Sequence, residues 1–477
     1  MSEEKDYSEI GFKAGIEIHQ QLDSGKLFSR TPSLLRSDSP EFDVKRKLHA
    51  IAGESGVVDE AVKHEAKLDR DFDYQGYSSI SLVELDEEPP EMIDEEALEI
   101  AMQIALLLNC EIIPVSQIMR KTVIDGSNTG GFQRTVLIAK NGFVETKDGK
   151  VGIDTVVLEE DACRIISREK EKTVYRLDRL GIPLIEIATA PDMKNPEQVK
   201  EVALQIGDVL RSCKVKRGIG TIRQDVNISV SKHPRVEIKG FQDVKMFLPT
   251  IEKEIERQLN DNDGKKEVRK AEANGETSFL RPMPGSARMY PETDLPLLFI
   301  SREKINSVKN KLPKLRDEIK FELKKKGLNS EMINLIVSDN LLEDFKSLEP
   351  LTNDLNLIVK MLVLWPKDIS KKIGKNLKQV EKILNLDVLE EILKKGVKEN
   401  LTNGVIQDMM AKVVSGVALE DVLKVEKKDL NDVEEFVSKI VKEKPGLSIG
   451  GYMGLVMAEF KGKVSGKEVM EILKRYV

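Results

Sequence analysis

The pattern of apolar residues changes near Ile300, and this change limits the chain to a mixed architecture. Before it, short β-branched runs stand between Gly and Pro residues, as in GFKAGIEIHQQL, YSSISLVEL, VGIDTVVLEED, IPLIEIATA, TIRQDVNISV and RVEIKGF. Short alternating runs between turn signals are typical of strands. After it, helical periods dominate, with Lys and Glu on the outer faces, as in IKFELKKKGL and VEKILNLDVLEEILKKGV. We therefore predict a sheet domain followed by helices.

Three helices are expected within the sheet region, at about 94–108, 195–211 and 248–259. The first begins with an acidic turn after Asp94, and the second begins at Asn195-Pro196, a capping side chain followed by proline. Unequal blocks of strands around few helices predict an α+β domain rather than repeated βαβ units. In the helical region, Trp365 and Pro366 are expected to end a core helix.

The length of 477 residues exceeds what one hydrophobic core usually supports, so several domains are expected. We predict a sheet domain over 1–300, a helical domain over 301–400 and a tail domain over 401–477. The second boundary rests on KKGVKENLTNG, where Gly and polar residues break the helical period.

Composition predicts a soluble cytoplasmic protein. The chain is 40% hydrophobic and 33% charged, and no apolar run approaches the roughly 18 residues that cross a bilayer. The opening MSEEKDYSE resembles neither a secretory signal nor a transit peptide. Cys110, Cys163 and Cys213 are too few and dispersed for a disulfide framework or zinc knuckle, which favours a reducing compartment and oxygen ligands for any metal. A net charge of −7 means that a nucleic acid would have to meet local basic patches.

Acidic side chains on apolar strands are the strongest chemical signal. They are Glu17 beside His19, then Glu159, Glu160 and Asp161, then Glu186, and finally Glu237. Strand alternation points Glu17 and His19 to one face. Buried carboxylates are costly unless paired or bound to a cation, and no lysine partner is expected between these strands, so we predict a Mg²⁺ site. The alternative is that these acids line the solvated face of an antiparallel sheet.

Basic residues near glycines and prolines are candidates for binding phosphate. They are Arg120, Lys121 and Arg134 in MRKTVIDGSNTGGFQR, Arg217 and Arg223 in VKRGIGTIRQD, Lys239, and Arg281, Arg288 and Tyr290 beside Glu292 and Asp294 in RPMPGSARMYPETDLP. Neither glycine segment has the spacing of a P-loop or a Rossmann fingerprint. The alternative to phosphate binding is therefore that these arginines are solvated side chains on ordinary turns.

Lysine clusters at 324–326 and at 371, 372, 375 and 378 could contact the phosphates of a nucleic acid or could simply be solvated helix faces. The cysteines lie in no recognisable nucleophile context, and no serine amidase signature is present. The chain is therefore not expected to release ammonia from an amide itself.

Eight strings in order resemble the E subunits of archaeal glutamyl-tRNA(Gln) amidotransferase, in the GatB/GatE family: AGIEIHQQL, SLVELDEEPP, RKTVIDGSNTGGFQRT, LEEDACR, YRLDRLGIPLIEIATAPD, KRGIGTIRQDVNISV, RVEIKG and RPMPGSARMYPETDLP. The likeness is dense from Gly11 to Leu298 and looser beyond. The bacterial B subunits match these strings less well.

The resemblance implies a cradle domain related to glutamine synthetase, with a mostly antiparallel sheet, then an all-α domain and a small helical tail, similar to YqeY, that binds tRNA. It implies metal ligands at Glu17, His19, one of Glu159 or Glu160, and Glu186, with Glu160 among the catalytic candidates. ATP and phosphate contacts are expected from Lys121, Arg134, Arg223, Lys239, Arg288 and Tyr290.

The implied reaction uses Mg²⁺ and ATP to convert the Glu side chain of Glu-tRNA(Gln) to a γ-glutamyl phosphate. Ammonia from an asparaginase-like D subunit then displaces phosphate, in an expected assembly of two E and two D subunits. Alternatives are a non-catalytic tRNA-binding scaffold, a bacterial-type B subunit that also accepts Asp-tRNA(Asn), and a small-molecule carboxylate–amine ligase.

Two departures from the family pattern are visible. Family E subunits usually carry an inserted domain resembling one in aspartyl-tRNA synthetase, for which only about Asp261 to Phe279 is available here. Ser29 stands after KLF, where a cysteine is expected, so no zinc site is predicted at that edge.

Overall fold

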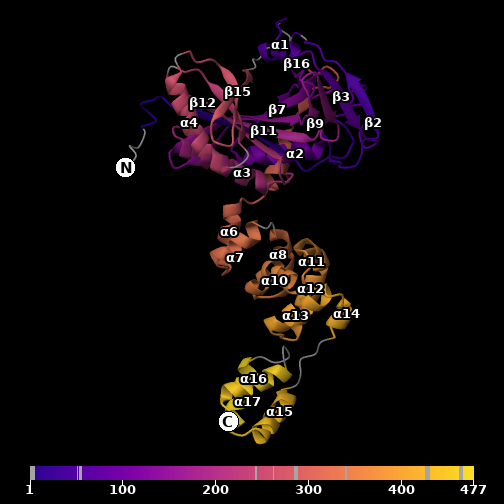
Figure 1. Cartoon of the computed structure of the whole chain (residues 1–477), viewed down its shortest axis with the longest axis vertical. Helices are drawn as coiled ribbons and strands as arrows, with labels where there is room; N and C mark the ends of the chain where they lie inside the picture. Colours follow the sequence, from indigo (N-terminus) through magenta and orange to yellow (C-terminus); the bar gives the residue numbers. More distant parts are fainter. Residues whose placement is uncertain are drawn as a thin grey trace. The chain divides into compact units, whose positions relative to one another are not determined.

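The computed structural model describes residues 6–50, 52, 56–231, 233–241, 244–261, 263–283, 288–338, 341–424, 430–460 and 466–476. The chain divides into two compact units, residues 1–315 and 316–477. Figure 1 draws the first in indigo to pink and the second in orange to yellow. The division into three domains at 300 and 400 stays a prediction.

The first unit contains most of the strands. Its strands are β1 (Lys13–Gln21), β2 (Phe42–Arg46), β3 (Asp71–Gly76), β4 (Glu111–Ile112), β5 (Val115–Ser116), β6 (Met119–Thr122), β7 (Phe132–Thr146), β8 (Gly149–Glu160), β9 (Arg164–Arg168), β10 (Lys172–Arg176), β11 (Pro183–Thr189), β12 (Ile222–Ser229), β13 (Val236–Phe241), β14 (Glu267–Ala271), β15 (Thr277–Pro282), β16 (Met289–Pro291) and β17 (Leu298–Phe299). Its helices are α1 (Glu60–Ala66), α2 (Glu95–Leu107), α3 (Pro196–Ser212), α4 (Phe247–Asn260) and α5 (Arg302–Asn310), with a short 3₁₀ turn at Val244–Met246.

An 11-stranded sheet organises this unit. Its order is β15-β14-β13-β12-β1-β11-β8-β7-β6-β16, with β4 paired to β7. Every pairing is antiparallel except that of β13 with β14. A second sheet has the order β2-β3-β10-β9, and β17 pairs with β5. The prediction of an α+β unit with a mostly antiparallel sheet, followed by helices, is confirmed.

Strand alternation separates the core from the site. On β1, Ile16 and Ile18 are buried in the same apolar core as residues of α2 and α3, so Glu17 and His19 face the other side of the sheet. Helices α2 and α3 contact β7, and α3 also contacts β1 (Figure 1). The large sheet therefore has a face packed against helices and a face that carries polar groups.

The three expected helices are confirmed, and their caps explain where they begin. Asp94 accepts a hydrogen bond from the backbone N–H of Ala97, and Asn195 accepts one from that of Gln198. These caps satisfy amides that have no partner within the first helical turn.

The expected strand in YSSISLVEL is wrong, because residues 77–85 form consecutive turns. The Glu84 carboxylate accepts hydrogen bonds from the backbone N–H and the hydroxyl of Ser81, and it also pairs with Lys26. Such local side-chain bonds compete with an extended strand, and an alternating pattern alone does not reveal them.

The second unit is helical throughout its described part. Its helices are α6 (Arg316–Lys325), α7 (Ser330–Ser338), α8 (Leu342–Leu348), α9 (Leu355–Val359), α10 (Trp365–Ile373), α11 (Leu377–Ile383), α12 (Leu386–Lys398), α13 (Asn403–Val414), α14 (Leu419–Val422), α15 (Leu430–Glu443), α16 (Ile449–Glu459) and α17 (Gly466–Tyr476). One apolar core spans Leu323 to Val422, and a separate core spans Val433 to Leu473. The expected boundary near 401 falls between α12 and α13, which share the first of these cores.

Trp365 and Pro366 do not end a helix, contrary to expectation. A π-helical segment, Lys360–Leu364, joins α9 to α10, so helical backbone continues through the proline. Proline has no N–H to donate to the preceding turn, and a π turn is one way to accommodate that defect within a helix. Among the described helices, none has both the length and the apolar character needed to cross a membrane.

Candidate metal and phosphate site

Three neighbouring strands bring His19, Glu159 and Glu186 together. His19 on β1 lies directly opposite Glu186 on β11, and β11 pairs in turn with β8, which carries Glu159. His19 Nε2 is 3.2 Å from a Glu186 carboxylate oxygen and 3.9 Å from one of Glu159. One potential ligand atom from each residue lies within 4.8 Å of the others, close enough for one metal ion. We call these residues the histidine cluster.

A second acidic group lies beside the first. Glu17 is two residues from His19 on β1 and lies opposite Asp225 on β12, and Glu237 on β13 completes the group. Their oxygens also lie within 4.8 Å of one another, and Asn227 Nδ2 donates to Glu17 over 3.0 Å. We call Glu17, Asp225 and Glu237 the carboxylate cluster. Asp225 was not singled out from the sequence, because its place opposite Glu17 depends on strand order.

A lysine accompanies each cluster, which corrects the expectation that no lysine partner lies among these strands. Lys121 Nζ is 2.7 Å from Glu159 and 3.7 Å from Glu186. Lys239 Nζ is 2.6 Å from Asp225 and 2.5 Å from Glu237. Lys239 follows Glu237 by two residues, so strand alternation already puts both on one face. Five carboxylates still face two lysines, and this excess of negative charge favours a bound cation.

The ionisation of the site follows from burial and these contacts. Burial alone would lower the pKa of His19, but the hydrogen bond to Glu186 and the carboxylates of Glu186 and Glu159 raise it. Burial would raise the pKa of Glu186, yet His19 and Lys121 hold it well below its ordinary value. The pKa of Glu17 is raised, first by burial and then by Glu237 and Glu186. The clusters therefore influence each other through their charges.

Glu160 is not brought into either cluster. It follows Glu159 on β8 and points to the opposite face, where it lies 3.4 Å from Arg134 Nη1. Arg134 is itself 95% buried and donates from Nε to Glu292 over 2.8 Å. Of the two candidates Glu159 and Glu160, the geometry selects Glu159 as a possible metal ligand, and Arg134 points away from the histidine cluster.

The remaining predicted phosphate contacts are placed as follows. Arg223 donates to Asp161 over 2.9 Å, and Asp161 also accepts from Gln21. Tyr290 lies opposite Arg120 in the β16–β6 pair and packs edge-on against Phe132. Arg288 is half-buried, and its charge acts on Glu186. Of the six residues, Lys121 and Lys239 contact the clusters directly.

Residues 12–306 match the family model described as GatB/GatE catalytic domain, a range that contains both clusters. The chain belongs to the GatB/GatE family.

Curated members of this family, each named as the E subunit of glutamyl-tRNA(Gln) amidotransferase, resemble the whole chain. Those from Methanocaldococcus jannaschii and Thermococcus sibiricus are each 33% identical, over 630 and 631 aligned positions that cover 99% and 100% of this chain and 99% of theirs. The one from Pyrococcus abyssi is 55% identical over 262 residues, which cover 54% of this chain and 41% of that protein.

This GatB/GatE member is shorter than its relatives. The alignment with the Methanocaldococcus protein has 630 positions and this chain has 477 residues, so at least 153 positions (630 minus 477) face a gap in this chain. An inserted domain was expected between α4 and β16, but only residues 261–279 are available for it. The described part of this segment forms the connection to β14 and most of the β14–β15 hairpin. That hairpin continues the large sheet through the pairing of β13 with β14.

Ser29, which stands where a cysteine was expected, belongs to a buried polar network in this family member. Its hydroxyl donates to Glu84 over 3.0 Å, and Lys26 Nζ pairs with the same carboxylate over 2.8 Å. Lys26 and Glu84 are both almost fully buried. An ion pair thus occupies this edge of the unit.

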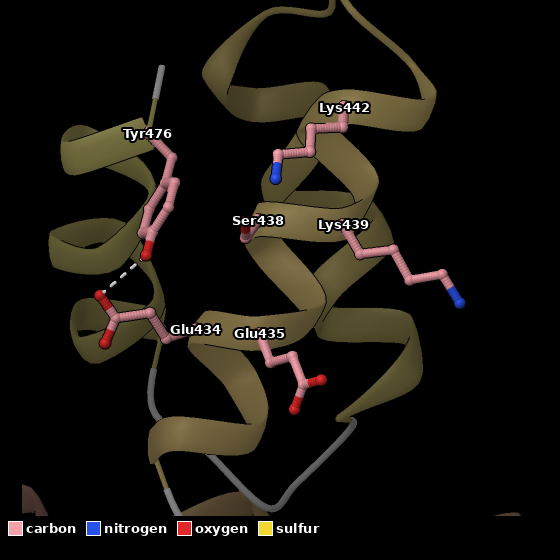
Figure 2. A pocket seen from close by; sticks show the side chains of 6 residues that line it. All are labelled: Glu434, Glu435, Ser438, Lys439, Lys442 and Tyr476. Atoms are coloured by element: carbon pink, nitrogen blue, oxygen red, sulfur yellow. Dashed lines mark hydrogen bonds between the residues drawn. The ribbon is translucent and has the colours of Figure 1, made fainter.

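A shallow depression lies on the last helices (Figure 2). Tyr476 of α17 points toward Glu434 of α15 and donates to it over 3.2 Å, whereas Glu435 and Lys439 point away. Two glutamates and two lysines line it, and it contains none of the site residues predicted from the sequence. It offers no convergent set of ligand groups.

Proposed function

We propose that this GatB/GatE member activates the Glu side chain of misacylated Glu-tRNA(Gln) with ATP and Mg²⁺, for amidation to Gln-tRNA(Gln). The observation that carries the proposal is the convergence of His19, Glu159 and Glu186 beside the carboxylate cluster. The relatives are named for a glutamyl-tRNA(Gln) amidotransferase, and that name supplies the substrate and the reaction class.

The donor sets fit divalent cations. The carboxylate cluster offers oxygens, which suit Mg²⁺, and the histidine cluster adds one imidazole nitrogen, which Mg²⁺ accepts less readily than transition metals do. His19, Glu159 and Glu186 would hold one ion, and Glu17, Asp225 and Glu237 could hold another. Bound there, the cation supplies charge neutralisation for phosphoryl transfer.

Phosphoryl transfer makes the carboxylate reactive. A γ-carboxylate oxygen of the Glu residue bonds to the γ-phosphorus of ATP, the bond to the bridging oxygen breaks, and ADP leaves. Ammonia then attacks the acyl carbon, phosphate departs with the former carboxylate oxygen, and one proton is lost as the amide forms. Lys121 and Lys239 contact the two clusters, and their ammonium groups would offset charge on the phosphoryl group.

The ammonia would come from a separate subunit, an asparaginase-like D subunit, in a cytoplasmic assembly of two E and two D chains. No amidase signature supports a source within this chain. We also propose that the first unit is the glutamine-synthetase-like cradle and that the C-terminal helices bind tRNA.

The experiment that tests this function combines the chain with its partner amidase, Glu-tRNA(Gln), ATP, Mg²⁺ and an amide donor. Gln-tRNA should form only with ATP. Glu186→Gln should abolish ATP-dependent phosphate release and leave tRNA affinity unchanged, because the amide is a poor metal ligand of nearly the same shape. The matched control is Glu145→Gln, an exposed residue on β7 paired with Lys150 at 3.3 Å.

Two results would contradict the proposal. Full activity of Glu186→Gln would exclude a metal-binding role for the histidine cluster. Tight tRNA binding with no turnover of any misacylated tRNA would instead indicate a non-catalytic scaffold.

A further inference from the structure

Glu17 lies between the two clusters, and its neighbours decide which cluster it joins. Its Cα partner on β11 is Ala188, which offers no ligand atom, whereas its Cα partner on β12 is Asp225. One carboxylate from each cluster, Glu186 and Glu237, acts on it through its charge. By position alone, Glu17 could therefore serve a cation in either cluster.

Asn227 holds Glu17 on the side of the carboxylate cluster. It follows Asp225 by two residues on β12, so both side chains point to the face of the clusters, and its Cα partner on β13 is Glu237. Its Cα partner on β1 is Gly15, which has no side chain and leaves room for the amide. Asn227 Nδ2 donates to Glu17 Oε1 over 3.0 Å. This bond fixes one carboxylate oxygen and leaves the other available to a cation.

The other polar atom of the Asn227 amide is an independent sign of a ligand. Oδ1 is buried, and no described residue donates a hydrogen bond to it. A buried acceptor without a donor is costly, and such an atom in a folded protein usually meets an ion or a water. Amide oxygens bind hard divalent cations, as carboxylate oxygens do. The same amide therefore turns Glu17 toward the carboxylate cluster and adds an oxygen beside it.

We infer that Asn227 assigns Glu17 to the carboxylate cluster and so divides the ligands between two cations. The family resemblance implied one ligand set, in which Glu17 accompanies His19 and Glu186. In the structure, the carboxylate of Glu17 converges instead with the other two acids of the carboxylate cluster. Asn227 acts through Glu17, so it is a positioning residue. The inference rests on the proposed function for the identity of the cations.

The test counts cations on the full chain, without ATP or tRNA, and uses Mn²⁺ as a probe that electron paramagnetic resonance detects in solution. Asn227→Leu removes both polar atoms of the amide with little change of size. Glu186→Gln removes one ligand of the histidine cluster. The matched control is Ser229→Ala, which lies on the same strand and face as Asn227, two residues farther from Asp225.

We expect two Mn²⁺ ions on the wild type and on Ser229→Ala. Asn227→Leu should weaken the binding of one ion about tenfold and that of the other less than about twofold. Glu186→Gln should weaken the other ion, so the double variant should lose both. A general loss of structure would weaken both ions in each single variant. Asn227→Gln, which keeps the amide, should recover part of the binding that Asn227→Leu loses.

A single ion on the wild type, lost in both Asn227→Leu and Glu186→Gln, would show that Glu17 belongs to one shared site and would overturn the inference. Two ions of unchanged affinity in Asn227→Leu would overturn it as well. If Asn227→Leu does not fold, Asn227→Ser provides the same test with a smaller polar side chain. Because the count needs neither ATP nor tRNA, the expected losses together with failed amidation would contradict the proposed function alone.

Discussion

Glu292 is fully buried and binds two arginines of the first unit. Its carboxylate accepts from Arg120 Nε over 2.8 Å and Nη2 over 2.6 Å, and from Arg134 Nε over 2.8 Å. Both guanidinium groups also lie over the ring of Phe132, at 4.4 and 5.1 Å from its centre. The acid thus joins β6, β7 and the segment that follows β16.

We predict that Glu292→Gln lowers the free energy of unfolding by about 3 kcal/mol, because one carboxylate no longer balances two arginines, one of them buried. Urea unfolding of the full chain measures this loss. The exposed Glu88→Gln is the control and should change stability by less than about 0.5 kcal/mol. Equal midpoints for Glu292→Gln and the wild type would show that the acid is not required for packing.

The buried Glu84 carboxylate makes the stability of the fold depend on pH in the acidic range. Burial would raise its pKa, but the Lys26 ammonium and the hydroxyls of Thr31 and Ser81 lower it to about 2. Because the pKa of Glu84 is depressed in the folded chain, its ionised and paired carboxylate stabilises the fold at pH values above 4.5, the ordinary pKa of the group. This stabilisation is lost as the pH falls from 4.5 toward 2. The contribution is roughly 3 kcal/mol.

Glu84→Gln should therefore be less stable than the wild type at pH 7 and should show a weaker loss of stability between pH 4.5 and 2. Urea unfolding at a series of pH values checks this. Parallel pH profiles for the two proteins would exclude Glu84 as a source of the acid dependence.

At the residue scale, the alternation of side chains between the two faces of a strand decides how much of the site is predictable. The i, i+2 rule placed Glu17 beside His19, and it would also have placed Lys239 beside Glu237. This alternation puts Glu159 and Glu160 on opposite faces of the sheet, but it does not say which of them faces the site. Asp225 was not singled out, and Lys121 was expected to bind phosphate but not to contact Glu159 and Glu186, because these positions depend on which strands are neighbours.

At the element scale, α10 and α11 carry a basic face. Residues 367–382 contain six lysines against Asp368 and Glu381, within a chain of net charge −7. Lys371, Lys372, Lys378 and Lys382 are exposed and form no ion pair with the described residues. Other lysines of this unit do, such as Lys394 with Glu390 at 2.7 Å and Lys412 with Asp408 at 3.2 Å.

Replacing these four unpaired lysines by Gln should weaken tRNA binding, and the slope of log affinity against log salt should fall by about one for each lysine–phosphate pair that is removed. The matched control replaces Lys346, Lys394, Lys412 and Lys424, which are all in ion pairs of the same unit. Filter binding with uncharged tRNA at several salt concentrations measures both sets. An equal effect of the two sets would indicate a general charge effect rather than a binding face.

Elements with strong end signals were predictable, and elements that depend on side-chain networks were not. Caps at Asp94 and Asn195 defined the starts of α2 and α3 correctly. Residues 77–85 had the alternation of a strand, but the hydrogen bonds of Glu84 hold them in turns. Pro366 signalled a helix end, but the π segment before it keeps the helix continuous.

At the scale of the whole molecule, the change of pattern near Ile300 predicted a sheet region followed by a helical region. The compact units divide at 315, because α5 contributes Val308 to the core of the sheet unit. Sheet order was not predictable, since β1 lies between β11 and β12, far from it in the sequence. That order creates the site, because it puts His19 opposite Glu186 and Glu17 opposite Asp225.

Transfer of an oxygen isotope tests the central claim most directly. Glu-tRNA(Gln) with ¹⁸O in both γ-carboxylate positions is amidated by the complete enzyme, and the released phosphate is analysed by mass spectrometry. Activation of the Glu side chain as an acyl phosphate predicts one ¹⁸O atom in each phosphate, and no phosphate release with Glu186→Gln. Unlabelled phosphate accompanying Gln-tRNA formation would contradict activation of the Glu side chain as an acyl phosphate.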